Sequence, residues 1–254
     1  MRGIWLARPK AAPQAAEPVQ AKGRLGWKGP FSLEIGQVAL FAWRIHNAKT
    51  RKPTDLNGDH TPTKGQAMTT QLLASVRAAF DTVAVARPFL AEWPEVGAMR
   101  DVQPATLPVC RWLSTMGTAG IVGQLRAAAP SLRWQQTYGA GDFGAEFLQG
   151  YGWSEFVGLR GPYPSTQIAC GVLLLGPHIT YPAHAHAAEE VYLPIFGQAE
   201  WQQGDSAFAP IPVGQPIHHA PWVPHAMRVG AEPLAALYLW RGGDLAAKSV
   251  ILSS

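Results

Sequence analysis

The feature that most constrains the fold is a change in the sequence pattern near Phe156. From this point, short runs of Val, Leu, Ile and aromatic residues recur at short intervals and are separated by Gly and Pro. Short strands with a turn signal every roughly 8–12 residues are typical of an all-β sandwich or barrel. We expect strands in the runs 167–175, 189–196, 198–203, 205–211, 225–229 and 234–241.

A helical pattern precedes the β-rich part. After residue 70, apolar residues recur at intervals of 4, 4 and 3, which predicts a helix with one apolar stripe. We expect this helix to begin near Met68, with Thr69 or Thr70 as its cap, and to end at Pro88. The stripe consists of Leu72, Val76, Phe80 and Val83, and two further short helices are expected at 105–116 and 119–129.

Charge and composition divide the chain into three parts. Residues 1–66 carry 11 Lys and Arg against 4 Asp and Glu, whereas residues 67–254 carry 10 against 13. The whole positive excess therefore lies in the first part, which is rich in Ala, Pro and Gln. We predict a basic, poorly ordered extension and linker over 1–66, a helical segment over 67–150 that packs on the barrel, and the β-barrel over 151–254.

Several classes of function are excluded. Lys248 is the only lysine after Lys64, so the folded part lacks the basic stripe of a nucleic-acid-binding module. No run reaches about 18 consecutive apolar residues, which excludes a membrane-spanning helix. Cys110 and Cys170 cannot form a disulfide framework or a Cys-based zinc site, and a reducing cytoplasm suits them. We therefore expect a cytoplasmic protein without nucleic-acid or membrane partners.

Six of the eight histidines lie in one stretch of 48 residues. His184 and His186 have the spacing that places two side chains on the same face of a strand, and Glu190 and Tyr192 share this face if extended structure resumes after the turn. Imidazole and carboxylate suit one divalent transition metal ion such as Fe, Zn, Mn, Ni or Co. A fourth ligand has to come from a distant strand, and His225 is the best candidate.

Each of these assignments has a structural alternative. A single histidine with apolar neighbours is more often a hydrogen-bonded core residue than a ligand, but four or five aligned donors are costly to bury without an ion. His184 can instead hold a water molecule beside the ion or act as an acid or base. We expect His218 and His219 to be loop residues that do not bind the ion, and His178 is not assigned.

The spacing of these residues resembles that of a known superfamily. His184-x-His186-x-x-x-Glu190, with Gly197 seven residues later, resembles the first cupin motif, and Pro-x-x-Pro-His225 resembles a shortened second motif. The resemblance implies a mainly β fold with a helical N-terminal part, in which a cupin barrel (a double-stranded β-helix, or jelly roll) is preceded by several α-helices.

A narrower resemblance starts at Gly176. The run Gly-Pro-x-x-x-Tyr181-Pro-x-His184-x-His186-x-Ala-x-Glu190-x-Tyr192 is similar to the cupin-type dimethylsulfoniopropionate (DMSP) lyases, the DddL/DddQ group. The similarity spans roughly residues 70–245 and includes Leu-Pro-Val-Cys-Arg-Trp (107–112) and Tyr238-Leu-Trp240. It implies a carbon–sulfur lyase that cleaves the small zwitterion DMSP to dimethyl sulfide and acrylate.

The resemblance also implies roles for individual residues. The reaction is a β-elimination in which a base removes the proton next to the carboxylate, and a metal that binds the carboxylate stabilises the charge. Tyr192 is expected to be the base, because a nearby cation lowers the pKa of a phenol, and Tyr181 is a second catalytic candidate. Tyr181, Tyr238 and Trp240 are expected to bind the sulfonium through their aromatic faces. The implied metal ligands are His184, His186, Glu190 and His225.

Other interpretations of the same residues stay open. Tyr192 can simply pack at the barrel mouth, and a single aromatic residue on a barrel strand is more often core than cation cage, so Trp201 and Trp222 are not assigned. The protein can be a cupin metalloenzyme of different specificity (an isomerase, a dioxygenase or another lyase), or a non-catalytic cupin that senses a metal or ligand. The sequence does not identify the metal or the oligomeric state, and a homodimer is one option.

Overall fold

The structure, a computed structural model, describes residues 63–252 except 96 and 98. Two mainly antiparallel sheets build its β-rich part. In the seven-stranded sheet the order is β1-β2-β4-β11-β6-β9, with β3 beside β2, and in the five-stranded sheet it is β12-β5-β10-β7-β8. The strands of the larger sheet are β1 (Trp134–Gln135), β2 (Tyr151–Gly158), β3 (Tyr163–Pro164), β4 (Ile168–Leu175), β6 (Glu189–Phe196), β9 (Ile217–His219) and β11 (Leu234–Arg241).

The five-stranded sheet is built from shorter strands. They are β5 (Thr180–Ala185), β7 (Ala199–Gln203), β8 (Ala209–Ile211), β10 (His225–Val229) and β12 (Val250–Ile251). The two sheets enclose a common interior, as expected for a double-stranded β-helix. The predicted fold class, a cupin-type barrel with a helical N-terminal part, is confirmed.

The central strands of the larger sheet are buried on both faces. Successive side chains of a strand point to opposite faces, and here each face meets a different apolar cluster. In β4, Ile168, Cys170, Val172 and Leu174 pack in the cluster that contains the helices, whereas Ala169, Leu173 and Leu175 pack in the barrel interior. In β11 and β6 the same alternation places the side chains of Tyr238 and Tyr192 in the interior.

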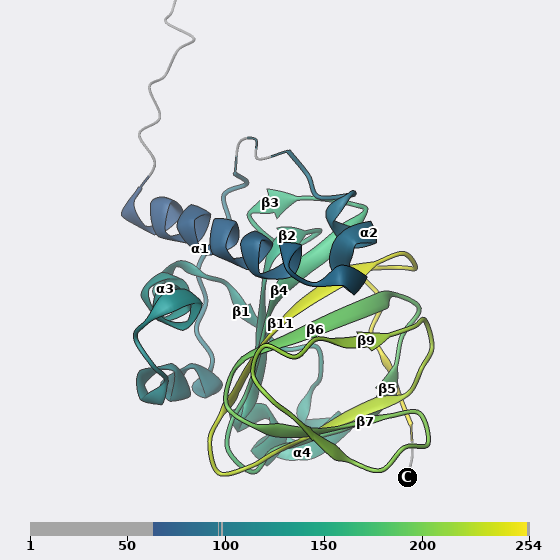
Figure 1. Ribbon diagram of the computed structural model, residues 1–254. Helices are drawn as coiled ribbons and strands as arrows, with labels where there is room; N and C mark the ends of the chain where they lie inside the picture. Colours follow the sequence, from purple (N-terminus) through teal and green to yellow (C-terminus); the bar gives the residue numbers. More distant parts are fainter. Residues whose placement is uncertain (1–62, 96, 98, 253–254) are drawn as a thin grey trace, which may run out of the picture. The chain divides into compact units, whose positions relative to one another are not determined.

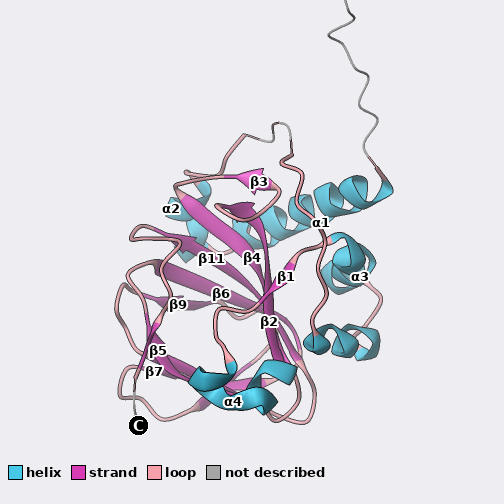
Figure 2. Ribbon diagram, turned by 180° about the vertical axis from the view of Figure 1, so that it is seen from behind, coloured by secondary structure: helices cyan, strands magenta, loops and turns pink. Residues whose placement is uncertain are grey.

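Helices cover the outer face of the larger sheet. Figure 1 shows α1, α2 and α3 on one side of this sheet and β5 and β7 on the other. Figure 2 shows α4 at one end of the two sheets, where Phe143 and Phe147 pack with Tyr181. The α-helices are α1 (Lys64–Asp81), α2 (Arg87–Leu90), α3 (Gly120–Ala128) and α4 (Ala140–Gln149), and the 3₁₀ helices are η1 (Ala84–Ala86), η2 (Pro108–Thr115) and η3 (Ala129–Ser131).

The first helix starts earlier than predicted. Thr63 is its N-cap and forms a capping box with Gln66, so residues 64–66, which we predicted as linker, form the first turn. Thr69 and Thr70 are not caps, because their hydroxyls donate to carbonyls one turn earlier in the helix. Three members of the predicted stripe are confirmed, since Leu72, Val76 and Phe80 are buried on α1. Val83 is buried as well, but it follows the end of α1 at Asp81.

Two other helix predictions need correction. Pro88 does not end the first helix but lies in the first turn of α2, where a missing N–H costs nothing. The segment 105–116 contains the 3₁₀ helix η2 rather than an α-helix. The helix expected at 119–129 is present as α3, whereas α4 was not predicted.

The predicted strands are present, although only residues 209–211 of the run 205–211 form a strand. The strands β1, β2, β3, β9 and β12 lie outside the predicted runs. The runs at 189–196, 225–229 and 234–241 coincide with β6, β10 and β11. His218 and His219, which we expected in a loop, instead belong to β9, which pairs with β6. This prediction was wrong because a strand of three residues, in a run of four between prolines, is too short to show alternation.

The turn between β6 and β7 depends on glycine. Gly197 joins β6 to β7 with φ +80°, and a Cβ there would lie 2.0 Å from the carbonyl oxygen of Pro233.

Cys110 and Cys170 are free thiols, as predicted. Within the described part of the chain, no helix has both the length and the apolar sequence that crossing a bilayer requires. The predicted extension lies almost wholly outside the described residues.

The shared core leads to a prediction about cooperativity. Phe80 is fully buried in the cluster that joins α1 to the sheet. We expect Phe80→Ala to cost about 3–5 kcal/mol and to lower Tm by about 10 °C in one transition that includes the barrel. Calorimetry and near-UV circular dichroism measure this, with the half-exposed Val85→Ala as control. Two separate transitions, with the barrel unchanged, would contradict it.

Candidate metal centre and cavity

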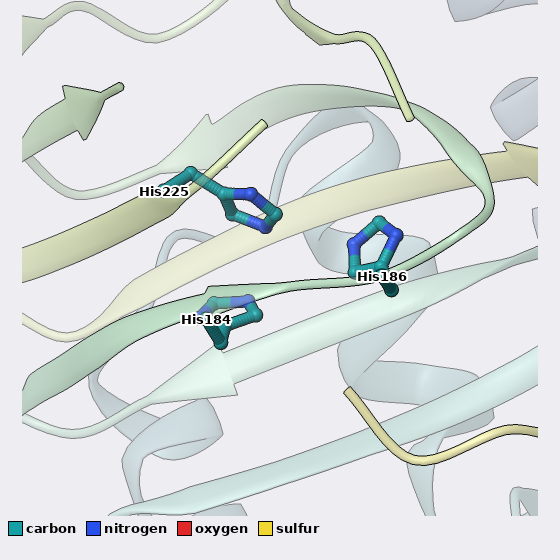
Figure 3. Close-up of side chains that lie close together, drawn as sticks. All are labelled: His184, His186 and His225. Atoms are coloured by element: carbon teal, nitrogen blue, oxygen red, sulfur yellow. The ribbon is translucent and has the colours of Figure 1, made fainter. Parts of the chain in front are cut away.

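Two paired strands of the five-stranded sheet bring three histidines together. His184 on β5 lies opposite His225 on β10, and His186 follows β5 directly. All three side chains are buried, and a ring nitrogen of each lies within 4.8 Å of the others. Figure 3 shows the three imidazoles around a common space. The structure therefore brings together the three histidines that the sequence singled out.

Backbone carbonyls hold the three rings. Nδ1 of His184 lies 2.8 Å from the carbonyl oxygen of Pro182, Nδ1 of His186 lies 2.9 Å from that of Ala188, and Nδ1 of His225 lies 3.0 Å from that of Val223. A carbonyl oxygen can only accept, so Nδ1 of each ring is the donor, and in a neutral ring Nε2 carries the lone pair. This arrangement is typical of imidazoles that bind a metal through Nε2.

Glu190 supplies a buried carboxylate beside the rings. Its Oε2 lies 3.0 Å from Nε2 of His186 and 3.3 Å from Nε2 of His225, and Nε1 of Trp240 donates to Oε1. Burial alone would raise the pKa of Glu190, but His186 and His225 hold it well below its usual range. Glu190 is thus an anion with no exposed surface, surrounded by nitrogen atoms.

The imidazoles differ in their tendency to take up a proton. Burial and the neighbouring His225 hold the pKa of His184 well below its usual range. Burial lowers the pKa of His186 as well, but the carboxylate of Glu190 outweighs it, so the net pKa of His186 is raised. The same carboxylate that would bind a cation therefore also compensates a protonated His186.

The strand register places the predicted aromatic residues around a cavity. Tyr192 on β6 lies opposite Tyr238 on β11, and Glu190 lies opposite Trp240. Tyr181, Tyr192, Tyr238 and Trp240 line a cavity of about 340 Å³ that also reaches His184. Five of the eight predicted metal and substrate contacts thus line this cavity, whereas His186, Glu190 and His225 are not among its lining residues.

Two of these aromatic rings also contact the histidines. The ring of Tyr181 stacks on His184 with centroids 4.1 Å apart, and its hydroxyl lies 2.9 Å from that of Tyr138. The indole of Trp240 stacks on His186 with centroids 4.3 Å apart, in addition to its hydrogen bond to Glu190. Trp240 therefore supports the candidate ligands and lines the cavity at the same time.

The tyrosines hold their protons firmly in the absence of a cation. Burial raises the pKa of Tyr192 well above its usual range, and the charge of Glu190 adds to this. Burial also raises the pKa values of Tyr181 and Tyr238 well above the usual range. Any deprotonation of Tyr192 thus depends on positive charge brought into the cavity.

Several residues that line the cavity were not predicted from the sequence. Tyr151, Glu155 and Arg160 line the cavity from β2 and the turn after it. Arg160 donates to the carbonyls of Leu245 and Ala246, and Nζ of Lys248 lies 2.8 Å from Asp142, so two contacts anchor residues 245–249 at the cavity wall. These residues lie far apart along the chain, and no spacing signal connects them.

His219 is the histidine whose position was predicted wrongly. It lies on β9 opposite Glu190, with no exposed surface, and its ring stacks on His225 with centroids 4.0 Å apart. Burial, together with His225, lowers the pKa of His219 to about 3. His218, in contrast, points outward and contacts Glu189 at 2.8 Å. In the sequence, only the alternation Ile217-His218-His219 could have indicated that His219 lies on a strand and points inward.

Comparison with known proteins links this site to one family. A model of the DMSP (dimethylsulfoniopropionate) lyase family matches residues 84–236, which include all four predicted ligands but end before Tyr238. The curated DMSP lyase DddQ of Ruegeria pomeroyi is 32% identical over 130 residues, or 51% of this chain and 65% of that protein. The matched region thus spans just under two thirds of that relative.

Two solved structures are similar to this chain over a longer region than the curated relative. A chain from the structures of the DMSP lyases RdDddP and RnDddQII has a TM-score of 0.69 at 30% identity, covering 74% of this chain and 100% of that chain. DddQ from Ruegeria pomeroyi DSS-3 has a TM-score of 0.66 at 28% identity, covering 73% and 96%. Since the family model matches more than half of its residues, the chain belongs to the DMSP lyase family.

Proposed function

We propose that the protein is a metal-dependent carbon–sulfur lyase that cleaves DMSP to dimethyl sulfide and acrylate. The observation that carries this proposal is the buried group of three imidazoles and one carboxylate at one side of a cavity walled by tyrosine and tryptophan. The membership of the chain in the DMSP lyase family supports the choice of substrate.

The side chains present fit a metal ion. His184, His186 and His225 would bind it through Nε2, and Glu190 through a carboxylate oxygen, which is a donor set for a divalent first-row ion. A bound divalent ion supplies positive charge that stabilises the substrate as negative charge develops beside its carboxylate, and that lowers the pKa of a neighbouring phenol.

Tyr192 is the proposed base. Its side chain lies on the same face of β6 as Glu190, lines the cavity, and has its ring 6.4 Å from that of His225. A base in this position can take the proton next to the substrate carboxylate, after which the C–S electron pair leaves with neutral dimethyl sulfide. Tyr181 is the second candidate, and its hydrogen bond with Tyr138 holds its hydroxyl in place.

Aromatic faces are proposed to hold the sulfonium. A cation over an aromatic ring gains about 0.5–2 kcal/mol and leaves no hold on a neutral product. Tyr181, Tyr238 and Trp240 line the cavity and present such faces. The two cationic side chains of the wall, Arg160 and Lys248, are both engaged with acceptors of the protein, which limits repulsion of the sulfonium.

Some finer parts of the proposal rest on the sequence alone. We propose Fe, Zn, Mn, Ni or Co as the resident ion, since the donors accept all of them. We also propose a bacterial, cytoplasmic protein, with a homodimer as one option; cell fractionation checks the location and sedimentation velocity the oligomeric state.

The first test of this proposal is metal binding. We expect the metal-depleted chain to bind one divalent ion, with a stabilisation of about 2.7 kcal/mol when free metal exceeds Kd a hundredfold. His186→Ala removes one nitrogen donor, so we expect a Kd at least about tenfold higher. Calorimetric titration measures both, with the exposed His178→Ala as matched control. Equal affinities for His186→Ala and wild type would contradict the proposed ligand set.

The second test concerns the base. Tyr192→Phe removes the phenolic oxygen but keeps the ring, so we expect dimethyl sulfide release to fall at least about 100-fold while metal content stays unchanged. Headspace gas chromatography measures the release. Tyr163→Phe is the matched control, because Tyr163 lies in the cluster on the other face of the sheet.

The outcomes of this test separate the alternatives. A Tyr192→Phe enzyme as fast as wild type would contradict the role of this residue and point to Tyr181. A wild-type kcat/KM for DMSP far below about 10⁴ M⁻¹s⁻¹ would favour a cupin metalloenzyme with another substrate. Specific metal binding without any turnover would favour a ligand-sensing protein.

The third test addresses the double role of Trp240. Trp240→Phe keeps an aromatic face but removes the N–H that donates to Glu190. We expect metal affinity to fall roughly tenfold, because the carboxylate loses its orienting partner. Competition with a chelator measures this, with the exposed Trp222→Phe as control. An unchanged metal affinity would mean that Trp240 lines the cavity but does not orient Glu190.

A further inference from the structure

His219 is a buried imidazole without a hydrogen-bond partner. The side chain has no exposed surface, and among the described residues neither Nδ1 nor Nε2 finds a donor or acceptor. A buried polar group without a partner destabilises the folded state. The other three rings of the site each have Nδ1 on a carbonyl oxygen, so this deficit distinguishes His219 from them.

The strand pairing directs this ring at the carboxylate of the site. β9 is at the edge of the larger sheet, and its pairing with β6 places His219 opposite Glu190. A ring nitrogen of His219, a carboxylate oxygen of Glu190 and a ring nitrogen of His225 lie within 4.8 Å of one another. This is a second group of three donors, and it shares His225 with the group formed by His184 and His186.

The side chains of the second group, Glu190, His219 and His225, are of types that bind metal ions. Two imidazoles and one carboxylate form a donor set that binds divalent first-row ions and leaves other coordination positions open. The ring of His219 stacks on that of His225, with the planes 12° and the centroids 4.0 Å apart, so a His219 nitrogen lies beside any ion that Glu190 and His225 share. Because an imidazole binds an ion in the plane of its ring, the His219 ring has to turn out of this stack when it binds.

We propose that His219 is a further metal ligand, acting with Glu190 and His225. The site then offers five protein donors, four imidazoles and one carboxylate, instead of the four that the sequence suggested. This inference rests on the metal centre of the proposed function but does not depend on DMSP as the substrate. It replaces our sequence-based expectation that His219 does not bind the ion.

The test counts imidazoles rather than turnovers. The metal-depleted full chain is loaded with Cu²⁺ for pulsed electron paramagnetic resonance, which detects the nitrogen atoms of bound imidazoles, and titrated with Co²⁺ for affinity. We expect His219→Gln to lose one imidazole from the spectrum and to bind Co²⁺ at least about tenfold more weakly. The matched control is His218→Gln, because His218 is the adjacent residue but faces Glu189.

A second variant covers the case in which His219→Gln folds poorly. His219→Gly leaves space for a free imidazole molecule, and we expect added imidazole to restore both the spectrum and the Co²⁺ affinity. An unchanged number of imidazoles in His219→Gln, or no rescue of His219→Gly, would overturn the inference. Because metal binding is measured without DMSP, a failure of lyase activity leaves this result interpretable, and a failure of wild-type metal binding overturns both proposals.

Discussion

The buried carboxylate of Glu190 is the constraint on which the rest of the site depends. Removing a carboxylate from water costs several kcal/mol even after the protein relaxes, and Glu190 has no exposed surface. His186, His225 and Trp240 compensate this cost from three different elements. The strands that carry them can tolerate little relative movement, because a displaced partner would leave the charge unpaired. The demand for compensation thus fixes the register of both sheets around the centre.

The helical part takes part in the site as well as in the core. Tyr138 precedes α4, and its hydroxyl bonds to that of Tyr181, whose ring in turn lies on His184. Lys248 contacts Asp142 of α4 and lies 5.0 Å from the ring of Tyr138. Residues before and after the barrel therefore complete the wall of the cavity. A barrel cut free of these segments would keep its candidate ligands but lose part of the enclosure.

Sequence reasoning succeeded where a local pattern reflects the three-dimensional arrangement. The strands β4, β6 and β11 are long enough to display their apolar residues, and the spacing of His184, His186 and Glu190 reflects the turn between two consecutive strands, β5 and β6, that belong to different sheets. It failed where the information is not local. The edge strand with His219 is too short to alternate visibly, and the cap at Thr63 lies in a polar stretch that reads as linker. Arg160 and the segment 245–249 meet only through tertiary structure.

The burial of β11 on both faces limits how the sequence of this strand can vary. Its odd-numbered residues, such as Leu237 and Leu239, face the helices, and its even-numbered residues, such as Tyr238, face the cavity. One inserted or deleted residue would exchange the two sets, sending aliphatic chains into the chamber and the phenol under the helices. Lineages that diverge in substrate can therefore vary this strand only by point replacement, while length changes are confined to the surface loops.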